Sequence, residues 1–332
     1  PSSVCLVLTI VARPPGPPLF PYTTLFRSLL LKIGEAGLPA ATEFLDPVIP
    51  QYLADLVSWA AIGARTTESQ THRQMASGFS MPTGFKNSTD GSISVAIDAI
   101  KTAAAKHSFL GVIEDGRMGV FNTKGNKSCH LVLRGGADGP NYGSEHIAFA
   151  KELMRKSGVT PSLVVDCSHG NSMKRPERQI DALRDAVAQV AAGQDCIAGF
   201  MLESYLKTGS QPIKDSSDMT PGLSVTDPCL GWTETEAAIR EAGVAFPNDF
   251  ERRDYAGKLA SEHGDKPKET LEAEGVQAQL AGRMMLKRVM GKASFATLQD
   301  MSGRIQVYVS NDLTGTESHE AFKHWDLGDF IG

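Results

Sequence analysis

Residues 162–204 read SLVVDCSHGNSMKRPERQIDALRDAVAQVAAGQDCIAGFMLES. Two short apolar runs, SLVVDCSH and CIAGFMLES, flank a segment in which Ile180, Leu183, Val187 and Val190 recur at helical spacing. Parallel strands are buried on both faces, so their sequences are nearly continuous apolar runs, and a helix joins one strand to the next. This stretch therefore predicts a βαβ unit and an α/β fold.

The same alternation continues toward the N-terminus. The runs PAATEF, AAIGA, MPTGFK and CHLVLRGG are typical of short strands, and helical spacing recurs between them, for example at Leu53, Leu56, Val57 and Ala60. Residues 108–128 contain two apolar runs around Asp115-Gly116, which predicts an inserted hairpin. Over residues 29–240 the pattern predicts an α/β fold with a parallel sheet, which we interpret as a (β/α) barrel of the TIM type.

A different architecture follows. Residues 241–275 are strongly charged and predict a helical linker. Over residues 276–332 the runs VQAQLAGRMM, KASFATLQD and GRIQVYVS predict antiparallel strands, and SHEAFKHW predicts a helix. The final run, GDFIG, has the character of a strand.

Residues 1–28, PSSVCLVLTIVARPPGPPLFPYTTLFRS, differ from the rest because they are apolar, interrupted by proline and poor in acids. A signal peptide is one interpretation of residues 4–11, but no basic start precedes them and no small-residue cleavage site follows. The stretch PPLFPYTTLFRS resembles translated adapter sequence. We therefore expect a non-native or disordered leader without fold or function.

Composition excludes several classes of protein. The 332 residues carry a net charge of −5, with 41% hydrophobic and 21% charged residues, which is ordinary for a globular protein and implies no general polyanion-binding surface. No apolar run reaches about 18 residues, so no membrane span is expected. The five cysteines are scattered without a CxxC pair, which predicts reduced thiols and a cytoplasmic location.

Polar residues close the predicted strands, and barrel chemistry takes place at the carboxyl ends of strands. These residues are Glu43, Arg65, Lys86, Arg134, His169, Glu203 and Asp227. The three bases suit phosphate and carboxylate groups, because arginine forms paired hydrogen bonds and lysine adds a point charge. The histidine and the carboxylates suit a divalent metal such as Mn, Fe, Co or Zn.

Each of these residues also has a structural interpretation. A single arginine at a strand end is more often a surface residue, His169 before Gly-Asn-Ser is more often a turn residue, and Asp227 before Pro228 can open a turn. Cys167 alternates with His169 along the strand, and we interpret it as filling of the barrel below the rim. The functional hypothesis therefore depends on the whole set occurring in register.

Four motifs resemble the class I 3-deoxy-D-arabino-heptulosonate 7-phosphate (DAHP) synthases of bacteria. They are GARTTESQTHRQMASGFSMPTGFKNSTDGS, LRGGADGPNY, DCSHGNSMK and LESYLKTGSQ. The resemblance implies a metal-dependent condensation of phosphoenolpyruvate with erythrose 4-phosphate, the first step of the shikimate pathway, with release of phosphate. It implies that Glu43, the Ala64 backbone, Arg65, Lys86 and Arg134 bind phosphoenolpyruvate.

The resemblance also implies that His169, Glu203 and Asp227 ligate the metal, that Asp227 lies at the substrate, and that Lys86 and His169 act in catalysis. The family's first two strands, which carry a further metal-ligating cysteine and phosphate-binding basic residues, have no counterpart in this sequence. We therefore expect an incomplete (β/α)8 barrel with strands three to eight and an impaired activity. Many family members are oligomers, so a homo-oligomer is a further expectation.

The second segment resembles the N-terminal anticodon-binding OB domain of bacterial class II lysyl-tRNA synthetases. The resemblance is carried by AGVAFPNDFERRDYAGKLA, GRMMLKRVMGKASFATLQDMSGRIQVYV and FKHWDLGDFIG. It implies a partial OB-fold β-barrel in which Phe295 stacks on an anticodon base near Arg288 and Gln306. Arg283, Lys287, Arg288 and Lys292 would supply positive charge beside it. The alternative is that Phe295 belongs to the core and that the basic run is a solvated hairpin.

Three hypotheses follow. The chain is a DAHP synthase acting on phosphoenolpyruvate and erythrose 4-phosphate, or a tRNA-binding OB module, or a chimera of two gene fragments without organised activity. Turnover with both substrates favours the first, and salt-dependent binding of an anticodon stem-loop favours the second.

Overall fold

The structure is a computed structural model that describes residues 4–9, 19–113, 117–242, 252–325, 327 and 329–332. Of these, residues 4–9, 19–25, 216 and 330 are described by their backbone alone. The chain divides into two compact units, Pro1–Ala245 and Phe246–Gly332.

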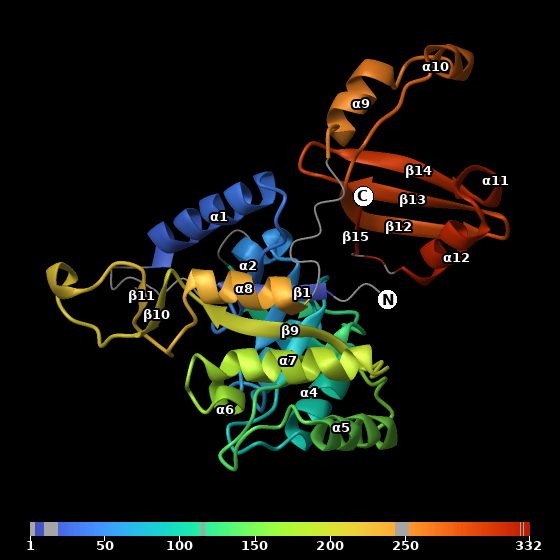
Figure 1. Cartoon of the computed structure of the whole chain (residues 1–332). Coiled ribbons are helices and arrows are strands. Elements are labelled where there is room, and N and C mark those ends of the chain that lie inside the picture. The colour runs from blue at the N-terminus through green and yellow to red at the C-terminus, as the bar shows by residue number, and fades with distance from the viewer. Residues whose placement is uncertain (1–3, 10–18, 114–116, 243–251, 326, 328) are drawn as a thin grey trace. The chain divides into compact units, whose positions relative to one another are not determined.

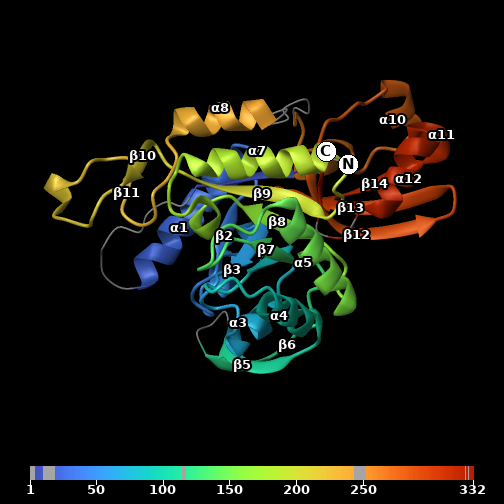
Figure 2. The ribbon, with the colours of Figure 1, turned by 60° about the horizontal axis from the view of Figure 1, so that its bottom comes forward.

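A parallel sheet forms the centre of the first unit. Its strands are β1 (Val4–Thr9), β2 (Ala41–Glu43), β3 (Trp59–Ile62), β4 (Thr83–Lys86), β7 (Cys129–Leu133), β8 (Leu163–Asp166) and β9 (Ile197–Ser204). The order across the sheet is β1-β9-β8-β7-β4-β3-β2, and every pairing is parallel. From β2 to β9 the neighbours follow chain order, and the strands curl into a half-barrel (Figures 1 and 2). The predicted α/β fold is confirmed.

Helices follow the strands, and most of them cover one face of this sheet (Figure 1). They are α1 (Leu19–Glu35), α2 (Pro50–Leu53), the 3-10 turn η1 (Ala54–Leu56), α3 (Gln70–Ala76), α4 (Ser94–Ala104), α5 (Ser144–Lys156), α6 (His169–Ser172), α7 (Arg178–Ala191) and α8 (Trp232–Ala242). The main core lies between these helices and strand residues such as Ile62, Phe85 and Val165. The intervening residues, among them Trp59, Val132 and Met201, form a smaller apolar cluster on the other face. Successive strand side chains point to opposite faces, so one strand serves both clusters.

Two smaller strand pairs are attached to the first unit. The predicted hairpin is present as β5 (Ser108–Val112) and β6 (Met118–Asn122), which pair antiparallel beside α3 and α4 (Figure 2). Its expected turn at Asp115-Gly116 lies outside the described residues. β10 (Lys207–Ser210) and β11 (Leu223–Ser224) pair in parallel and enclose the 3-10 turn η2 (Ser216–Asp218).

Two regions differ from the sequence-based expectation. The helical spacing from Leu53 to Ala60 is misleading, because helical turns end at Leu56 and Ala60 lies fully buried in strand β3. The first 28 residues, expected to have no fold, contain β1 and the start of α1. Arg27 in α1 donates two hydrogen bonds to the Asp55 carboxylate, at 2.7 and 2.6 Å. These contacts fix α1 against the segment that precedes β3.

The second unit contains an antiparallel sheet in the order β14-β13-β12-β15, formed by β12 (Gly282–Met290), β13 (Ala293–Gln299), β14 (Arg304–Ser310) and β15 (Phe330–Ile331). Its helices are α9 (Ala256–His263), α10 (Lys268–Glu274), α11 (Asn311–Thr314) and α12 (Thr316–His324). The predicted helix at SHEAFKHW and the predicted final strand are confirmed. The first strand spans Gly282–Met290, so it begins later than the run VQAQLAGRMM suggested, and a turn follows at Gly291, where φ is +65°.

Two further expectations can be compared with the described part of the chain. Cys129, Cys196 and Cys229 are buried and form no disulfide among the described residues, as predicted for reduced thiols, and Cys167 is buried as well. Among the described residues, no helix combines the length and the apolar character needed to cross a bilayer.

Candidate active site

The inner face of the sheet turns from apolar to charged at the carboxyl ends of its strands. Lys86 closes β4 on the face opposite Phe85, and Asp166 closes β8 two residues after Val164. Glu203 follows Met201 in β9 with the same two-residue period. Strand alternation therefore carries charged side chains to one rim above the inner apolar cluster.

Lys86 is the centre of a buried ionic group. Its Nζ lies 3.2 Å from Asp166 Oδ2 and 3.5 Å from Glu43 Oε2, and its side chain is only 6% exposed. Burial alone would lower the pKa of Lys86, but the Asp166 and Glu43 carboxylates outweigh it and raise that pKa. The same ion pairing outweighs burial at Asp166 and lowers the pKa of that carboxyl. Both groups therefore stay charged in the interior.

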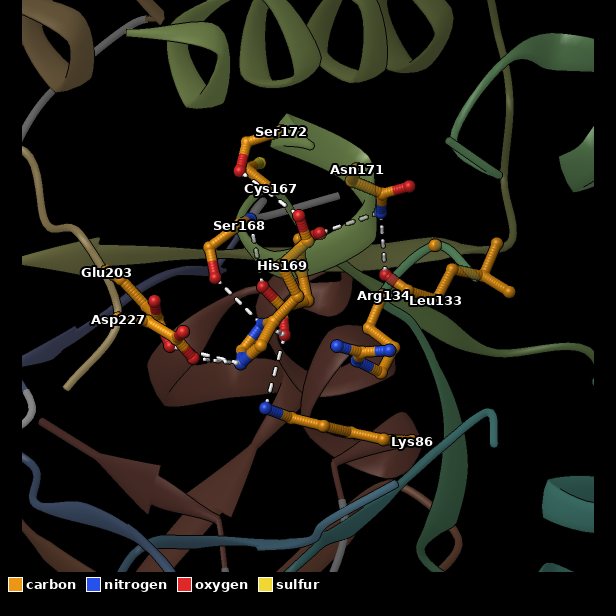
Figure 3. Close-up of polar contacts among 12 residues, drawn as sticks. Lys86, Leu133, Arg134, Cys167, Ser168, His169, Asn171, Ser172, Glu203 and Asp227 are labelled. Carbon is orange, nitrogen blue, oxygen red and sulfur yellow. Dashed lines mark hydrogen bonds and ion pairs between the residues drawn. The ribbon is translucent and has the colours of Figure 1, made fainter. Parts of the chain in front are cut away.

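The two ring nitrogens of His169 lie near three carboxylates. Nδ1 lies 3.0 Å from Asp166 Oδ2, whereas Nε2 lies 3.3 Å from Glu203 Oε1 and 3.7 Å from Asp227 Oδ2 (Figure 3). Its backbone φ of +53° is in the left-handed region, which a residue with a side chain rarely adopts. Burial would lower the pKa of His169, but the charge of Asp166 outweighs burial and raises that pKa.

The group formed by His169, Glu203 and Asp227 fits a divalent metal. One ligand atom from each lies within 4.8 Å of the other two. Burial raises the pKa of Glu203, although positive charge on His169 and Lys86 opposes the rise. A buried carboxylate of this kind is stabilised by a cation, and one imidazole with two carboxylates is a set that Mn, Fe or Zn accepts.

Neighbouring polar groups fix the strand ends that carry the charged residues of the rim. The Gln179 side chain in α7 accepts a hydrogen bond from the Glu203 N–H at 2.8 Å and donates one to its carbonyl at 3.1 Å. Thr67 Oγ1 lies 2.8 Å from the Lys86 carbonyl oxygen and 2.9 Å from that of Gly63. A Cβ added at Gly63 would lie 2.3 Å from Glu43 Oε1, so only glycine lets this carboxylate approach.

The predicted site residues are brought together in part. Lys86, Arg134, His169, Glu203 and Asp227 converge in one region (Figure 3), and Glu43 joins them through Lys86. Ala64 and Arg65 follow β3 directly after Gly63, but the Arg65 side chain is exposed. Within the described ranges, it makes no hydrogen bond or ion pair with the other rim residues.

Asp166 is the residue that the sequence prediction missed. It lies between Lys86 and His169 and is fully buried. The sequence carries the signal, because an acidic residue ends the apolar run LVV and, by strand alternation, faces the inner side, but the prediction names only His169 from this stretch. Cys167 was placed wrongly. It packs in the core between sheet and helices, because β8 ends at Asp166 and strand alternation does not extend to His169.

The second unit brings its predicted residues to one face of the sheet. Arg288 pairs with Phe295, which pairs with Tyr308, and Gln306 pairs with Thr297 one row away. The rings of Phe295 and Tyr308 lie 5.1 Å apart. Lys287 does not belong to this face, contrary to the sequence-based expectation. It alternates with Arg288 and donates a hydrogen bond to the Lys323 carbonyl at the end of α12, at 2.8 Å.

Comparison with known families supports this division of the chain. A model of the DAHP synthetase I family matches residues 25–240, which is more than half of the chain. The chain therefore belongs to the DAHP synthetase I family. A second model, of an OB-fold nucleic acid binding domain, matches residues 278–332. The resemblances to DAHP synthases and to an OB-fold anticodon-binding domain are both confirmed at the level of these families.

Among curated relatives, the Phe-sensitive phospho-2-dehydro-3-deoxyheptonate aldolase of Escherichia coli K12 is 51% identical over 219 residues, covering 66% of this chain and 62% of the relative. The Trp-sensitive enzyme of the same strain is 48% identical over 226 residues, covering 68% of this chain and 65% of the relative. A solved aldolase structure from Francisella tularensis has a TM-score of 0.64 and 44% identity over 66% of this chain and 64% of that one. The chain thus spans less than two thirds of the length of these relatives.

Proposed function

We propose that the first unit catalyses the metal-dependent condensation of phosphoenolpyruvate with erythrose 4-phosphate to give DAHP and phosphate. The observation that carries this proposal is the rim itself. Two cationic side chains, Lys86 and Arg134, lie beside a group of His169, Glu203 and Asp227 that fits a metal. The reaction joins a dianionic enol phosphate to an aldehyde, so it requires an anion site next to an electrophilic centre.

The residues divide between the two substrates. Arg134, Lys86 and Arg65 would hold the carboxylate and phosphate of phosphoenolpyruvate, with Glu43 and the Ala64 backbone beside them. The charge of Lys86 is held in place by Glu43 and Asp166 before the substrate arrives, and preorganised charges of this kind usually contribute more to catalysis than any other single effect. Glu43 and Asp166 would keep Lys86 protonated and oriented, as their distances of 3.5 and 3.2 Å suggest.

His169, Glu203 and Asp227 would hold the metal, and Asp227 would also contact substrate. A divalent ion bound there would supply Lewis-acid polarisation of the aldehyde oxygen of erythrose 4-phosphate. In the proposed reaction, C3 of phosphoenolpyruvate bonds to the aldehyde carbon, water adds at C2, and phosphate leaves. Lys86 and His169 are the residues that we propose to act at the reacting atoms.

We further propose that the curled sheet represents part of a (β/α)8 barrel. β2, β3, β4, β7, β8 and β9 would correspond to its third to eighth strands. Their all-parallel order in chain sequence and the family membership support this assignment.

The experiment is a phosphate-release assay on the whole chain with both substrates and Mn²⁺. Release should require both substrates, stop with a chelator and return with added Mn²⁺. Asp227→Asn should abolish it, whereas Asp138→Asn, an exposed acid in the loop that carries Arg134, should not. Absence of release in the wild-type chain would refute the proposal. A full-length relative assayed beside it tests the expectation that this chain turns over more slowly.

A second candidate function concerns the second unit alone. We propose that it binds single-stranded RNA of the anticodon-loop type, as the resemblance to lysyl-tRNA synthetase suggests. The row of Arg288, Phe295 and Tyr308 supports this, because stacking rings beside a cation suit bases and phosphates. A lysine anticodon stem-loop should bind in a salt-dependent manner, and Phe295→Ala should weaken binding roughly tenfold or more. Equal binding by Phe295→Ala and wild type would exclude the stacking role.

A further inference from the structure

Three asparagine side chains lie buried at the charged rim, and no role in binding substrate or metal accounts for them. Asn87 follows β4, Asn141 lies in the loop after β7, and Asn171 lies in α6 after β8. Their exposed fractions are 0%, 7% and 2%. A buried amide side chain is destabilising unless it is hydrogen-bonded, so its partners indicate its purpose.

These partners converge on two residues. The backbone N–H of Arg134 donates to Asn87 Oδ1 at 2.8 Å, and that of Gly135 donates to Asn141 Oδ1 at 2.8 Å. Asn87 Nδ2 donates to the Gly135 carbonyl at 2.9 Å, and the Asn171 N–H donates to the Arg134 carbonyl at 3.2 Å. All four backbone polar atoms of Arg134 and Gly135 are therefore bonded to these asparagines.

The asparagines are also joined to one another and to the strand ends. Asn141 Nδ2 donates to Asn87 Oδ1 at 3.2 Å, and the Asn141 N–H donates to Asn171 Oδ1 at 2.8 Å. Asn171 Nδ2 donates to the carbonyls of Leu133 and Asp166, at 3.1 and 2.7 Å. Asn171 thus connects the ends of β7 and β8 where their ladder stops.

Glycines allow the three loops to pack this closely. A Cβ on Gly135, whose φ is +74°, would lie 2.4 Å from the carbonyl carbon of Gly170. A Cβ on Gly136 would lie 2.5 Å from the Cα of Gly91. Because the loop backbones are in direct contact, the backbone N–H and C=O groups of these loops need side-chain partners, and the asparagines provide them.

We propose that Asn87, Asn141 and Asn171 are positioning residues for Arg134. We call these three asparagines the asparagine clamp. The clamp fixes the backbone at the base of a long, rotatable side chain, so that the guanidinium faces the anion site beside Lys86. A displacement of about 1 Å in such a group can reduce a rate by roughly a hundredfold. The functional part of this inference rests on the proposed function, whereas the clamping of the backbone does not.

A general contribution to stability is the alternative, and the chain offers a matched control. Asn126 is 5% exposed, donates to the Met81 carbonyl and Thr83 Oγ1 at 3.0 and 3.2 Å, and accepts from the Ser128 N–H at 3.0 Å. It has the same chemistry and burial as Asn87 but lies at the amino end of β4. Asn126→Ala and Asn87→Ala should therefore remove similar bonds at opposite ends of one strand.

The experiment compares Asn87→Ala, Asn126→Ala and the wild type as whole chains. Asn87→Ala removes the acceptor of the Arg134 N–H, so amide hydrogen exchange at Arg134 should be roughly tenfold faster in this variant than in Asn126→Ala and the wild type. The dissociation constant for phosphoenolpyruvate, measured by calorimetry, should rise roughly ten- to hundredfold in Asn87→Ala but not in Asn126→Ala. Affinity for Mn²⁺ should stay unchanged in both variants, because neither residue touches the metal group.

Each result decides a separate point. Unchanged exchange at the Arg134 amide in Asn87→Ala would overturn the clamp. Equal phosphoenolpyruvate affinity in Asn87→Ala and Asn126→Ala would overturn its positioning role. If the wild type binds no phosphoenolpyruvate, the proposed function fails and the exchange data alone decide the clamp. If Asn87→Ala does not fold, Asn141→Ala, which removes the bond to the Gly135 N–H, takes its place in both measurements.

Discussion

Acid should destabilise the first unit through His130, a buried histidine away from the charged rim. Its Nε2 lies 3.0 Å from Trp59 Nε1, and its Nδ1 lies 3.2 Å from the Ser128 carbonyl oxygen. An indole N–H can only donate, so Nε2 must accept and the ring must be neutral, with its proton on Nδ1. Protonation would place two N–H groups face to face in a site that is only 7% exposed.

The pKa of His130 gives the magnitude. Burial lowers this pKa from 6.5 to about 4, and the Ser128 carbonyl opposes the shift only in part. Because the folded-state value is the lower one, the unfolded chain binds the proton first. The stability is therefore present above about pH 6.5 and is lost as pH falls toward about 4. The difference in pKa corresponds to about 3 kcal/mol in total, of which about 2 kcal/mol is lost by about pH 4.5.

Urea unfolding at about pH 7 and about pH 4.5 measures this loss in the wild type and in His130→Gln. Glutamine keeps an acceptor for the Trp59 N–H but does not titrate, so the variant shares every other pH effect. The wild type should lose about 2 kcal/mol more free energy of unfolding than the variant over this interval. Equal losses would show that His130 does not have the depressed pKa and would refute the reasoning.

Two substitutions at the rim extend these tests. Asp166→Asn removes one of the two carboxylates that pair with Lys86 in the described part of the chain, so the free energy of unfolding should fall by about 3 kcal/mol in urea titrations. Mn²⁺ affinity should fall roughly tenfold or more, and unchanged values would contradict the ionic role. Gly63→Ala should displace the Glu43 carboxylate and weaken phosphoenolpyruvate binding in calorimetry. Gly34→Ala, where an added Cβ meets nothing within 4 Å, should leave that binding unchanged, and equal behaviour of the two alanine variants would count against Glu43.

Strand parity explains why much of the rim could be predicted from sequence. Lys86 and Arg134 follow buried apolar strands, and the carboxyl ends of parallel strands meet at one edge, so pattern alone brings them together. Parity also shows that Asp166 lies inside, but the prediction names only His169 from this stretch, beyond the end of β8. The same oversight put Lys287 beside Phe295, although one residue along a strand reverses the face.

Periodicity failed where an apolar stretch changes its backbone conformation. Leu53, Leu56 and Ala60 fit a helix by spacing, yet a helical turn, an extended residue and a buried strand occupy this interval. Short apolar runs satisfy both periods, and only the neighbouring strand selects between them. Here Ala60 becomes a strand residue because it pairs with Thr83 in β4.

The asparagine clamp lies beyond this kind of prediction for a different reason. A hydrophobic pattern in the sequence identifies buried side chains only when they are apolar. A buried asparagine therefore cannot be told from an asparagine in a surface loop. Asn87 bonds to Arg134, Gly135 and Asn141, which lie 47, 48 and 54 residues away, and its bonds to Arg134 and Gly135 are to backbone atoms that no residue type reveals. The charged residues of this rim follow from strand order, but the accuracy with which Arg134 is held depends on polar contacts between loops. A chain could therefore keep every charged residue of the rim and still lose anion binding through Asn87 alone, which the comparison with Asn126→Ala is designed to detect.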